Sequence, residues 1–290
     1  MEITKFRGVS YRNGYHDFII DRSGINVFPR LIAAEHRSEH DTGQLKSGIS
    51  ELDMLLGGGI EFGTSMLLLG PAGSGKSSTA IQYAIAAARR GECAAMFTFD
   101  ERIHTVMERT QGLGMDLKEY VDKGLVTINA IDPAEIPPGE FAWRVASAAE
   151  GKDGKAPVRV VIIDSLNGYL NAMPEERFLI AQLHELLTYL GHKGIVTFLV
   201  VAQHGLLGTT QAPVDTSYLA DSVLLFRYFE SRGEVKQLLS VVKKRSGDHE
   251  RTVREFRLVN RRGICIGGPL NQFENLFPAL DARPTGNGAK

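Results

Sequence analysis

One short stretch decides the fold class, because Gly70-Pro71-Ala72-Gly73-Ser74-Gly75-Lys76-Ser77 fits the pattern G-x-x-x-x-G-K-[ST]. An apolar strand expected over Ser65 to Leu69 precedes it, and a helix expected over Gly75 to Arg90 follows it. Glycines in such a loop let backbone N–H groups turn inward around phosphate oxygens, and the helix adds its positive N-terminal end. The pattern therefore predicts a phosphate-binding loop (P-loop) rather than a glycine-rich turn with an exposed lysine.

Residue types in this loop suit the phosphates of a nucleotide and their metal ion. Lys76 is expected to reach the β- and γ-phosphates, and the Ser77 hydroxyl is expected to ligate Mg²⁺. The candidate nucleotide-binding residues of the segment are Gly70, Pro71, Ala72, Gly73, Ser74, Gly75, Lys76, Ser77 and Ser78.

Acidic residues end two other predicted strands. Asp164 ends the apolar run Val158 to Ile163, where a carboxylate can hold the water shell of Mg²⁺ or, alternatively, cap the next helix. Asp100 and Glu101 end the strand expected over Ala94 to Phe99. A carboxylate beside the γ-phosphate can orient and deprotonate the attacking water. Glu101 is therefore the candidate base, helped by Asp100, and a candidate metal contact; the alternative is that both residues cap the helix that follows.

The rhythm of the chain predicts an α/β fold. Over residues 43–260, apolar runs alternate with helical patterns, as in a mostly parallel twisted sheet flanked by helices. The later strands, expected over Ser222–Phe229, Val235–Val242 and Val253–Leu258, should extend the sheet in antiparallel fashion. Gln203 ends a further strand, where its amide either senses the γ-phosphate or makes an ordinary buried hydrogen bond.

Three zones divide the chain. Residues 1–42 form an N-terminal β-like extension or linker, with a hairpin expected between Phe18 and Phe28. Residues 43–265 form the nucleotide-binding domain. Residues 266–290 are rich in glycine and proline and are expected to be a flexible C-terminal tail.

Composition excludes several classes of protein. With 290 residues, 43% hydrophobic and 23% charged, the chain is unlike a disordered protein. A net charge of -1 gives no electrostatic footprint for general nucleic-acid binding. Cys93 and Cys265 are too few for a disulfide framework. The start of the chain is polar, and no apolar run reaches about 18 residues, so a cytoplasmic protein without a membrane span is expected.

Further motifs follow the P-loop in a specific order. They are Ser47-Gly48-Ile49, Leu52-Asp53, Leu56-Gly57-Gly58-Gly59-Ile60, Phe97-Thr98-Phe99-Asp100-Glu101, Ile163-Asp164-Ser165, Val201-Ala202-Gln203-His204, Arg232-Gly233-Glu234, Lys243-Lys244-Arg245-Ser246-Gly247-Asp248-His249 and Arg254-Glu255-Phe256. Taken together with the P-loop, they resemble the KaiC-type ATPases of the RecA-like superfamily over about residues 46–262. The resemblance implies a RecA-like fold, with ATP and Mg²⁺ as cofactors.

The resemblance also implies a homohexamer with ATP at the subunit interfaces. One subunit supplies the P-loop, and its neighbour supplies a Lys-x-Arg pair that contacts the γ-phosphate. Lys243 and Arg245 match this pair, and His249 and Arg251 match nucleotide contacts that follow it. Residues two apart on a strand face the same side, so both cations can address one phosphate. The alternative is a charged edge strand kept soluble by its lysines and arginine.

Two departures concern the kinase activity of clock-type members. Those members carry two such domains and place Glu-Glu where this chain has Asp100-Glu101, and the shorter Asp100 weakens the expectation of autophosphorylation. They phosphorylate an adjacent Ser-Thr pair, which Ser217 and Tyr218 match here. Ser217 is thus either a candidate phosphate acceptor in a serine/threonine autokinase or a plain loop residue.

Two other functions remain as alternatives. A RecA- or RadA-like DNA-dependent ATPase would need cations and rings in the loops at residues 167–177 and 205–217, which carry one cation against three carboxylates. A nucleotide-switched scaffold with negligible turnover would use ATP to dock signalling partners. Either way, the sequence does not specify whether the output is a clock, a stress response or other signalling.

Overall fold

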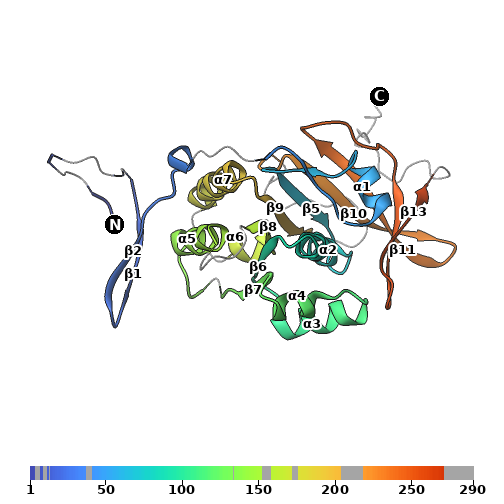
Figure 1. The fold of residues 1–290 in the computed structure, drawn as a ribbon, viewed down its shortest axis with the longest axis horizontal. Coiled ribbons are helices and arrows are strands. Elements are labelled where there is room, and N and C mark those ends of the chain that lie inside the picture. Colours follow the sequence, from blue (N-terminus) through green and yellow to red (C-terminus); the bar gives the residue numbers. More distant parts are fainter. Residues whose placement is uncertain are drawn as a thin grey trace, which may run out of the picture.

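A nine-stranded sheet forms the centre of the computed structural model, which describes residues 1–3, 7–8, 12, 14–36, 41–132, 134–151, 158–171, 176–203 and 218–270 (Figure 1). The strand order is β13-β12-β11-β10-β5-β9-β8-β6-β7. The bounds are β5 (Ser65–Gly70), β6 (Cys93–Thr98), β7 (Val126–Ala130), β8 (Val158–Asp164), β9 (Val196–Ala202), β10 (Ser222–Ser231), β11 (Glu234–Lys244), β12 (Arg254–Val259) and β13 (Gly263–Pro269). This order places β5, which leads into the P-loop, in the middle of the sheet.

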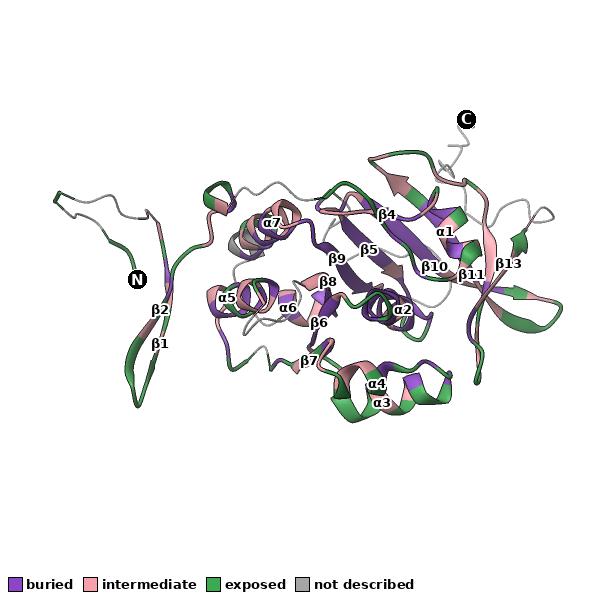
Figure 2. Ribbon diagram, in the orientation of Figure 1, coloured by how far each residue is buried: buried purple, intermediate pink, exposed green. Residues whose placement is uncertain are grey.

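Helices cover both faces of the sheet. On one face lie α1 (Ser50–Leu55), α2 (Lys76–Arg89), α3 (Ile103–Gly112) and α4 (Leu117–Asp122), and on the other lie α5 (Pro138–Ala149), α6 (Leu166–Asn171) and α7 (Glu176–His192). Successive residues of β8 pack alternately against the two groups of helices, since Val160 lies in the core beneath α1–α4 and Val161 in the core beneath α5–α7. A strand buried on both faces must be apolar throughout, and the middle strands are buried along their length (Figure 2).

The predicted α/β class with a RecA-like core is confirmed, with one correction to the strand directions. From β5 through β9, β8 and β6 to β7 all pairings are parallel. β10 was expected to begin the antiparallel part, but it also runs parallel to β5. β10 is reached by a long connection after β9, which permits a parallel return, whereas the tight turn at residues 231–233 forces β11 to run antiparallel to β10.

Several short elements were not predicted. β13 runs to Pro269, so residues 266–269, which were expected to belong to a flexible tail, lie in an edge strand paired with β12. α1, α4, and the small ladder of β3 (Gln44–Leu45) and β4 (Ile60–Glu61) were also missed. They are too short to show a clear hydrophobic period.

The N-terminal segment lies outside the central sheet. The expected hairpin is present as β1 (Asp17–Asp21) and β2 (Gly24–Phe28), followed by the 3₁₀ turn η1 (Ala33–His36). The hairpin projects at the end of the molecule opposite β11–β13 (Figure 1). Among the described residues, no helix is long and apolar enough to cross a membrane.

Candidate functional site

The P-loop joins β5 to α2, and its glycines are required by its shape. Gly73 and Gly75 have φ values of +75° and +98°, in the left-handed region that favours glycine. A Cβ on Gly75 would also lie 2.4 Å from Cε1 of Phe256. The loop therefore wraps closely under β12 and presents its backbone at the start of α2.

Lys76 lies folded over this loop. Its ammonium group donates hydrogen bonds to the carbonyl oxygens of Gly70 at 2.8 Å and Pro71 at 2.6 Å. Burial lowers the pKa of Lys76 to about 8, although the nearby Asp164 carboxylate opposes the shift. Phosphate oxygens entering the loop can take the place of these carbonyl oxygens and restore the charged form.

Two side chains outside the motif hold the loop from neighbouring strands. The Tyr228 hydroxyl of β10 donates to the Ala72 carbonyl at 3.3 Å, and the Gln237 amide of β11 donates to the Gly73 carbonyl at 3.3 Å. Both residues also line an open depression of about 620 Å³ beside the loop. Sequence reasoning missed both, because a polar residue in a strand carries no motif.

Asp164 lies at the end of β8, next to the start of α2. It pairs in register with Thr98 of β6, so the ends of these two parallel strands meet at one edge of the sheet. Burial raises the pKa of Asp164, and the hydrogen bond from the Ser77 hydroxyl and the charges of Arg109 and Lys76 oppose this. The sequence-predicted metal pair, Ser77 and Asp164, is thus in direct contact.

Glu101 lies beside them and is held by an arginine that the sequence did not reveal. Arg109 donates from Nη2 to Oε2 of Glu101 at 2.6 Å and from Nη1 to Oγ of Ser78 at 3.1 Å. Burial raises the pKa of Glu101, although the Arg109 charge opposes it. Arg109 lies in the last turn of α3, where an arginine is common and looks like an ordinary surface residue, so no motif pointed to it.

Asp100 points to a different partner from Glu101. Its Oδ2 accepts a hydrogen bond from the Ser165 hydroxyl, which itself accepts one from the Gly168 N–H at 3.3 Å. Asp100 thereby connects the end of β6 to the residue that follows Asp164, and it remains exposed. The two adjacent carboxylates are held by separate contacts rather than as an equivalent pair.

Gln203 follows β9 directly beside the P-loop. Its N–H donates to the Gly70 carbonyl at 3.0 Å. Asn167 fixes the preceding residue, since its amide donates to the Ala202 carbonyl at 3.0 Å and accepts from the Ala202 N–H at 2.7 Å. Asn167 was not predicted, and it sets the position from which the Gln203 side chain leaves the sheet.

The residues around Asp164 fit a magnesium ion. Oδ2 of Asp164 is buried and has no hydrogen-bond partner among the described residues, which is a state that a cation or its water shell would relieve. Mg²⁺ favours oxygen ligands and is usually held by one or two carboxylates together with substrate phosphates. Asp164 and the Ser77 hydroxyl would hold it, while Glu101 lies on the same side of the sheet.

Lys243 and Arg245 lie at the amino ends of the parallel strands, whereas the P-loop of the same chain lies at their carboxyl ends. Ser222 pairs with Met66 at the start of β5 and with Lys244 at the end of β11. Gly70 is four residues beyond Met66, about 13 Å along an extended strand. The structure therefore does not bring this Lys-x-Arg pair together with the P-loop of the same chain.

The two cations are held where the sheet begins. Lys243 donates to the Ala220 carbonyl at 2.8 Å. Arg245 donates to Oδ1 of Asp221 at 3.2 Å and to the Tyr218 carbonyl at 2.9 Å. Arg245 is exposed, so its guanidinium group is available at the surface of the molecule.

Lys244, between them, points inward and explains the glycine run after α1. Its side chain is 1% exposed and contacts Oε1 of Glu61 at 3.0 Å. It also donates to the carbonyl oxygens of Leu56 at 2.6 Å and Gly59 at 3.3 Å. A Cβ on Gly57 would lie 2.0 Å from the Asp248 carbonyl oxygen, so the motif around residues 56–60 packs closely on the end of β11.

The other predicted contacts lie beyond this point. His249 is half-buried and Arg251 is exposed, and both lie in the segment between β11 and β12, where the N–H of Glu250 donates to the Leu55 carbonyl at 3.0 Å. Ser217 lies outside the described residues, and so does the loop at residues 205–217.

A P-loop between a strand and a helix, with a buried aspartate on the next strand but one and a glutamate at the adjacent strand end, defines the class of P-loop ATPase cores. The comparisons identify the family within this class. A family model described as ATPase: KaiC matches residues 45–271. The chain belongs to the KaiC ATPase family.

Curated relatives carry the same family name. The chain is 26% identical over 288 residues to the circadian clock oscillator protein KaiC of Picosynechococcus sp., covering 98% of this chain and 54% of that protein. It is 27% identical over 287 residues to the protein of that name from Synechococcus elongatus, covering 98% and 54%. It is 27% identical over 267 residues to the circadian clock protein KaiC2 of Synechocystis sp., covering 90% and 45%. The chain thus spans about half the length of the curated relatives it matches.

Proposed function

We propose that this chain hydrolyses ATP with Mg²⁺ as a homohexamer in which each ATP lies between two subunits. The P-loop binds the phosphates, and Ser77 and Asp164 hold the metal. Glu101, helped by Asp100, accepts the proton of the attacking water. Mg²⁺, when bound, neutralises charge on the β- and γ-phosphate oxygens.

One contact network carries this proposal. Arg109 connects Glu101 to Ser78, the residue after the Ser77 hydroxyl that contacts Asp164. A carboxylate, a metal site and a phosphate loop are thereby fixed next to one another. Burial raises the pKa of Glu101, which improves a carboxylate as a proton acceptor near neutral pH.

Action of Lys243 and Arg245 on a neighbouring subunit is the second part of the proposal. The pair lies at the amino ends of the parallel strands, and the P-loop of the same chain lies at their carboxyl ends. A head-to-tail ring is therefore the arrangement in which the pair can reach a nucleotide, namely that of the next subunit. In that ring His249 and Arg251 also contact the nucleotide bound by the neighbouring subunit. Gln203 responds to the γ-phosphate of the nucleotide bound by its own P-loop. An arginine supplied in this way can raise the rate by about 10³–10⁵-fold.

The substitution Glu101→Gln tests the proposed base. It should leave the ATP dissociation constant within about threefold and lower turnover at least about 100-fold, because a group acting on the transition state is lost. The matched control is Glu108→Gln, which removes an exposed carboxylate from α3, the helix that follows Glu101. Isothermal calorimetry and phosphate release measure the two properties, and turnover unchanged by Glu101→Gln would rule out this role.

Autophosphorylation and timing complete the proposal. Ser217 is the proposed acceptor, by its match to the phosphorylated pair of clock-type members, and intact-mass measurement after incubation with ATP tests it. No added phosphate would remove this part without affecting hydrolysis. Since the relatives are named as circadian clock proteins, we place the chain in nucleotide-dependent signalling, where slow hydrolysis sets how long a partner stays docked.

A further inference from the structure

The N-terminal hairpin exposes an apolar face. Phe18 and Ile20 of β1 and Ile25 and Val27 of β2 point to the same side, because Phe18 pairs with Val27 and Ile20 pairs with Ile25. Phe18 is 42% exposed, Ile20 is 74% exposed and Ile25 is 60% exposed. A two-stranded hairpin is marginally stable without something packed on its apolar face.

The same hairpin occurs a second time in the chain, as β12 and β13. There Phe256 pairs with Ile266 and Leu258 pairs with Ile264, which repeats the register of the N-terminal pairs. The sequences agree too, since Gly24-Ile25-Asn26-Val27 corresponds to Gly263-Ile264-Cys265-Ile266. β12–β13 has one more residue in its turn.

The likeness continues upstream of both hairpins. Phe18 follows Lys5-Phe6-Arg7 at the same spacing at which Phe256 follows Lys243-Lys244-Arg245. At this spacing Met1 and His16 correspond to Leu239 and Arg254. Met1 and His16 exchange backbone hydrogen bonds of 2.6 Å, and Leu239 and Arg254 are register partners in β11 and β12. The described residues from Met1 to Val27 therefore correspond to Leu239 to Ile266, apart from the additional turn residue.

The two copies differ in what covers them. Phe256 is fully buried: its ring meets that of Phe226 edge-on at 5.2 Å, and it lies against Gly75 at the start of α2. Ile264 is 7% exposed. The cover is thus the P-loop core itself, through β10, β11 and the start of α2. The equivalent face around Phe18 has no such cover from the described residues.

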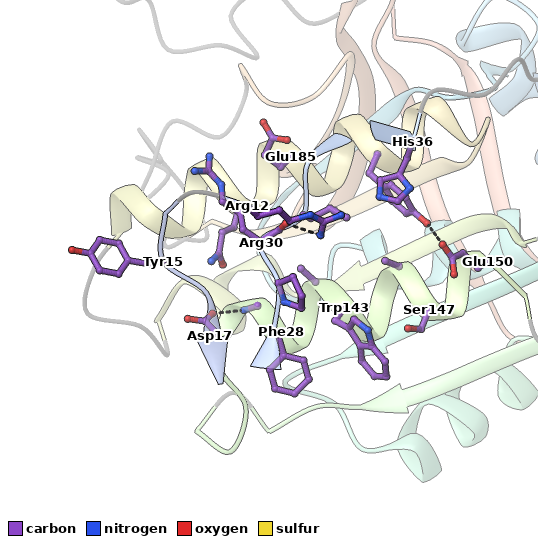
Figure 3. Close-up of a pocket in the computed structure, with 17 residues that line it drawn as sticks. Arg12, Tyr15, Asp17, Phe28, Arg30, His36, Trp143, Ser147, Glu150 and Glu185 are labelled. Carbon is purple, nitrogen blue, oxygen red and sulfur yellow. Dashed lines mark hydrogen bonds between the residues drawn. The ribbon is translucent and has the colours of Figure 1, made fainter. Parts of the chain in front are cut away.

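The core formed by the described residues does not provide that cover. Its matching surface is filled by β12–β13, at the end of the molecule opposite the hairpin (Figure 1). The other side of the hairpin already contacts the core, because Asp17 accepts a hydrogen bond from the Gly139 N–H at 2.6 Å and the rings of Phe28 and Trp143 lie 6.0 Å apart. These contacts border a cavity of about 250 Å³ between the hairpin, α5 and α7 (Figure 3).

We propose that the exposed face of β1–β2 docks a second P-loop ATPase core of the same class, which it completes as β12–β13 completes the core of this chain. The second core supplies a strand like β11 along β1 and the start of a P-loop helix over Phe18. The hairpin then lies between two cores, in contact with α5 of one and the nucleotide loop of the other. The curated relatives have length for such a core, since this chain covers only about half of each.

A fusion supplies the second core directly. Residues 43–238 are joined to Met1 of the full chain, so that Met1 takes the position of Leu239. Backbone amides of β1 should exchange hydrogen at least about tenfold more slowly than in the unfused chain, since they become paired and buried. The matched control carries Ile20→Asp and Ile25→Asp in the same fusion and should lose the protection. Unchanged exchange in the fusion, or equal protection in the control, overturns the proposal.

A transplant tests the fit within one core. Replacing residues 255–266 by residues 17–27 puts Phe18 in the place of Phe256, and the protein should unfold cooperatively, whereas the transplant carrying Ile20→Asp and Ile25→Asp should not. A transplant no more stable than that control contradicts the proposal.

Hydrogen exchange on the unmodified chain tests whether a second copy of this chain covers the exposed face of β1–β2 instead. Protection of β1 that increases with protein concentration would mean that another copy of this chain covers the face, and the proposal would be wrong. Since none of these measurements uses ATP, they can succeed or fail independently of the proposed hydrolysis.

Discussion

The cationic side chains at the two ends of the parallel strands differ in their contacts and in their exposure. At the carboxyl end, Lys76 and Arg109 are drawn into contacts with the P-loop, Glu101 and Ser78. At the amino end, Lys243 and Arg245 bind backbone carbonyls and Asp221, and Arg245 remains exposed. The two groups of cations do not meet within one chain, and this is the geometry expected if adjacent subunits share each nucleotide site, as we propose.

Mixing two inactive variants is the most severe test of this division. Lys76→Ala should lose ATP binding, and Arg245→Ala should lose hydrolysis by about 10³-fold. In randomly mixed equimolar rings about one interface in four pairs an intact P-loop with an intact Arg245, so phosphate release should recover to about a quarter of the wild-type rate. The control mixes Arg245→Ala with a double variant that carries both changes, in which no interface is complete. If the first mixture stays as inactive as this control while subunits exchange, the shared site is disproved.

Adjacent lysines at the amino end sharpen the comparison. Lys244→Met should lower the free energy of unfolding by about 3 kcal/mol, because Glu61 would lose its buried partner. Burial is the largest single influence on the pKa of Glu61 and raises it, but the hydrogen bonds from Lys244, Ser246 and the backbone, together with the Lys244 charge, outweigh burial and lower the pKa. Lys243→Met should have a smaller effect on stability and reduce turnover instead. Urea unfolding measures the difference.

A compensating change checks the cause of that loss. In Lys244→Met combined with Glu61→Gln, much of the stability should return, because the half-buried carboxylate is no longer left without its partner. If the double variant is as unstable as Lys244→Met, the lysine acts through packing rather than through Glu61.

The residues of the candidate site at the carboxyl ends of the strands could be predicted from the sequence, whereas the residues that hold them in place could not. The P-loop, Asp164 and Glu101 follow strand ends, and parallel strands necessarily bring such positions together. Arg109, Asn167 and Tyr228 could not be predicted, because their roles depend on which elements lie side by side in space. The burial of Lys244 was equally hidden, since a run of three cations normally indicates a solvated surface. The repeat of the β12–β13 hairpin became recognisable only when the registers of the two pairs could be compared.

Arg109 provides a smaller test at the carboxyl end. Arg109→Lys keeps a charge but cannot hold Glu101 and Ser78 together, so turnover should fall about tenfold with little change in ATP affinity. Arg109 is a positioning residue, and the neutral variant Arg109→Gln should also shift the acidic limb of the pH–rate profile to higher pH, because the Arg109 charge opposes the rise in the pKa of Glu101. Arg102→Lys, on the exposed residue that precedes α3, is the control. A profile displaced to lower pH would contradict this assignment.

The pH dependence of binding separates Lys76 from the cations of the other end. Because burial lowers the pKa of Lys76 to about 8, the free protein loses this charge as the pH rises through that value. A bound triphosphate favours the ammonium form, so binding above pH 8 must take up a proton, at about 1.4 kcal/mol for each further pH unit. ATP affinity should thus be nearly constant from pH 7 to 8 and fall up to about tenfold by pH 9. Calorimetry of Glu101→Gln, in buffers that differ in ionisation enthalpy, measures the proton uptake without turnover; if no proton is taken up at pH 9, Lys76 is already charged in the free protein and the contrast between the two ends is weaker than the structure indicates.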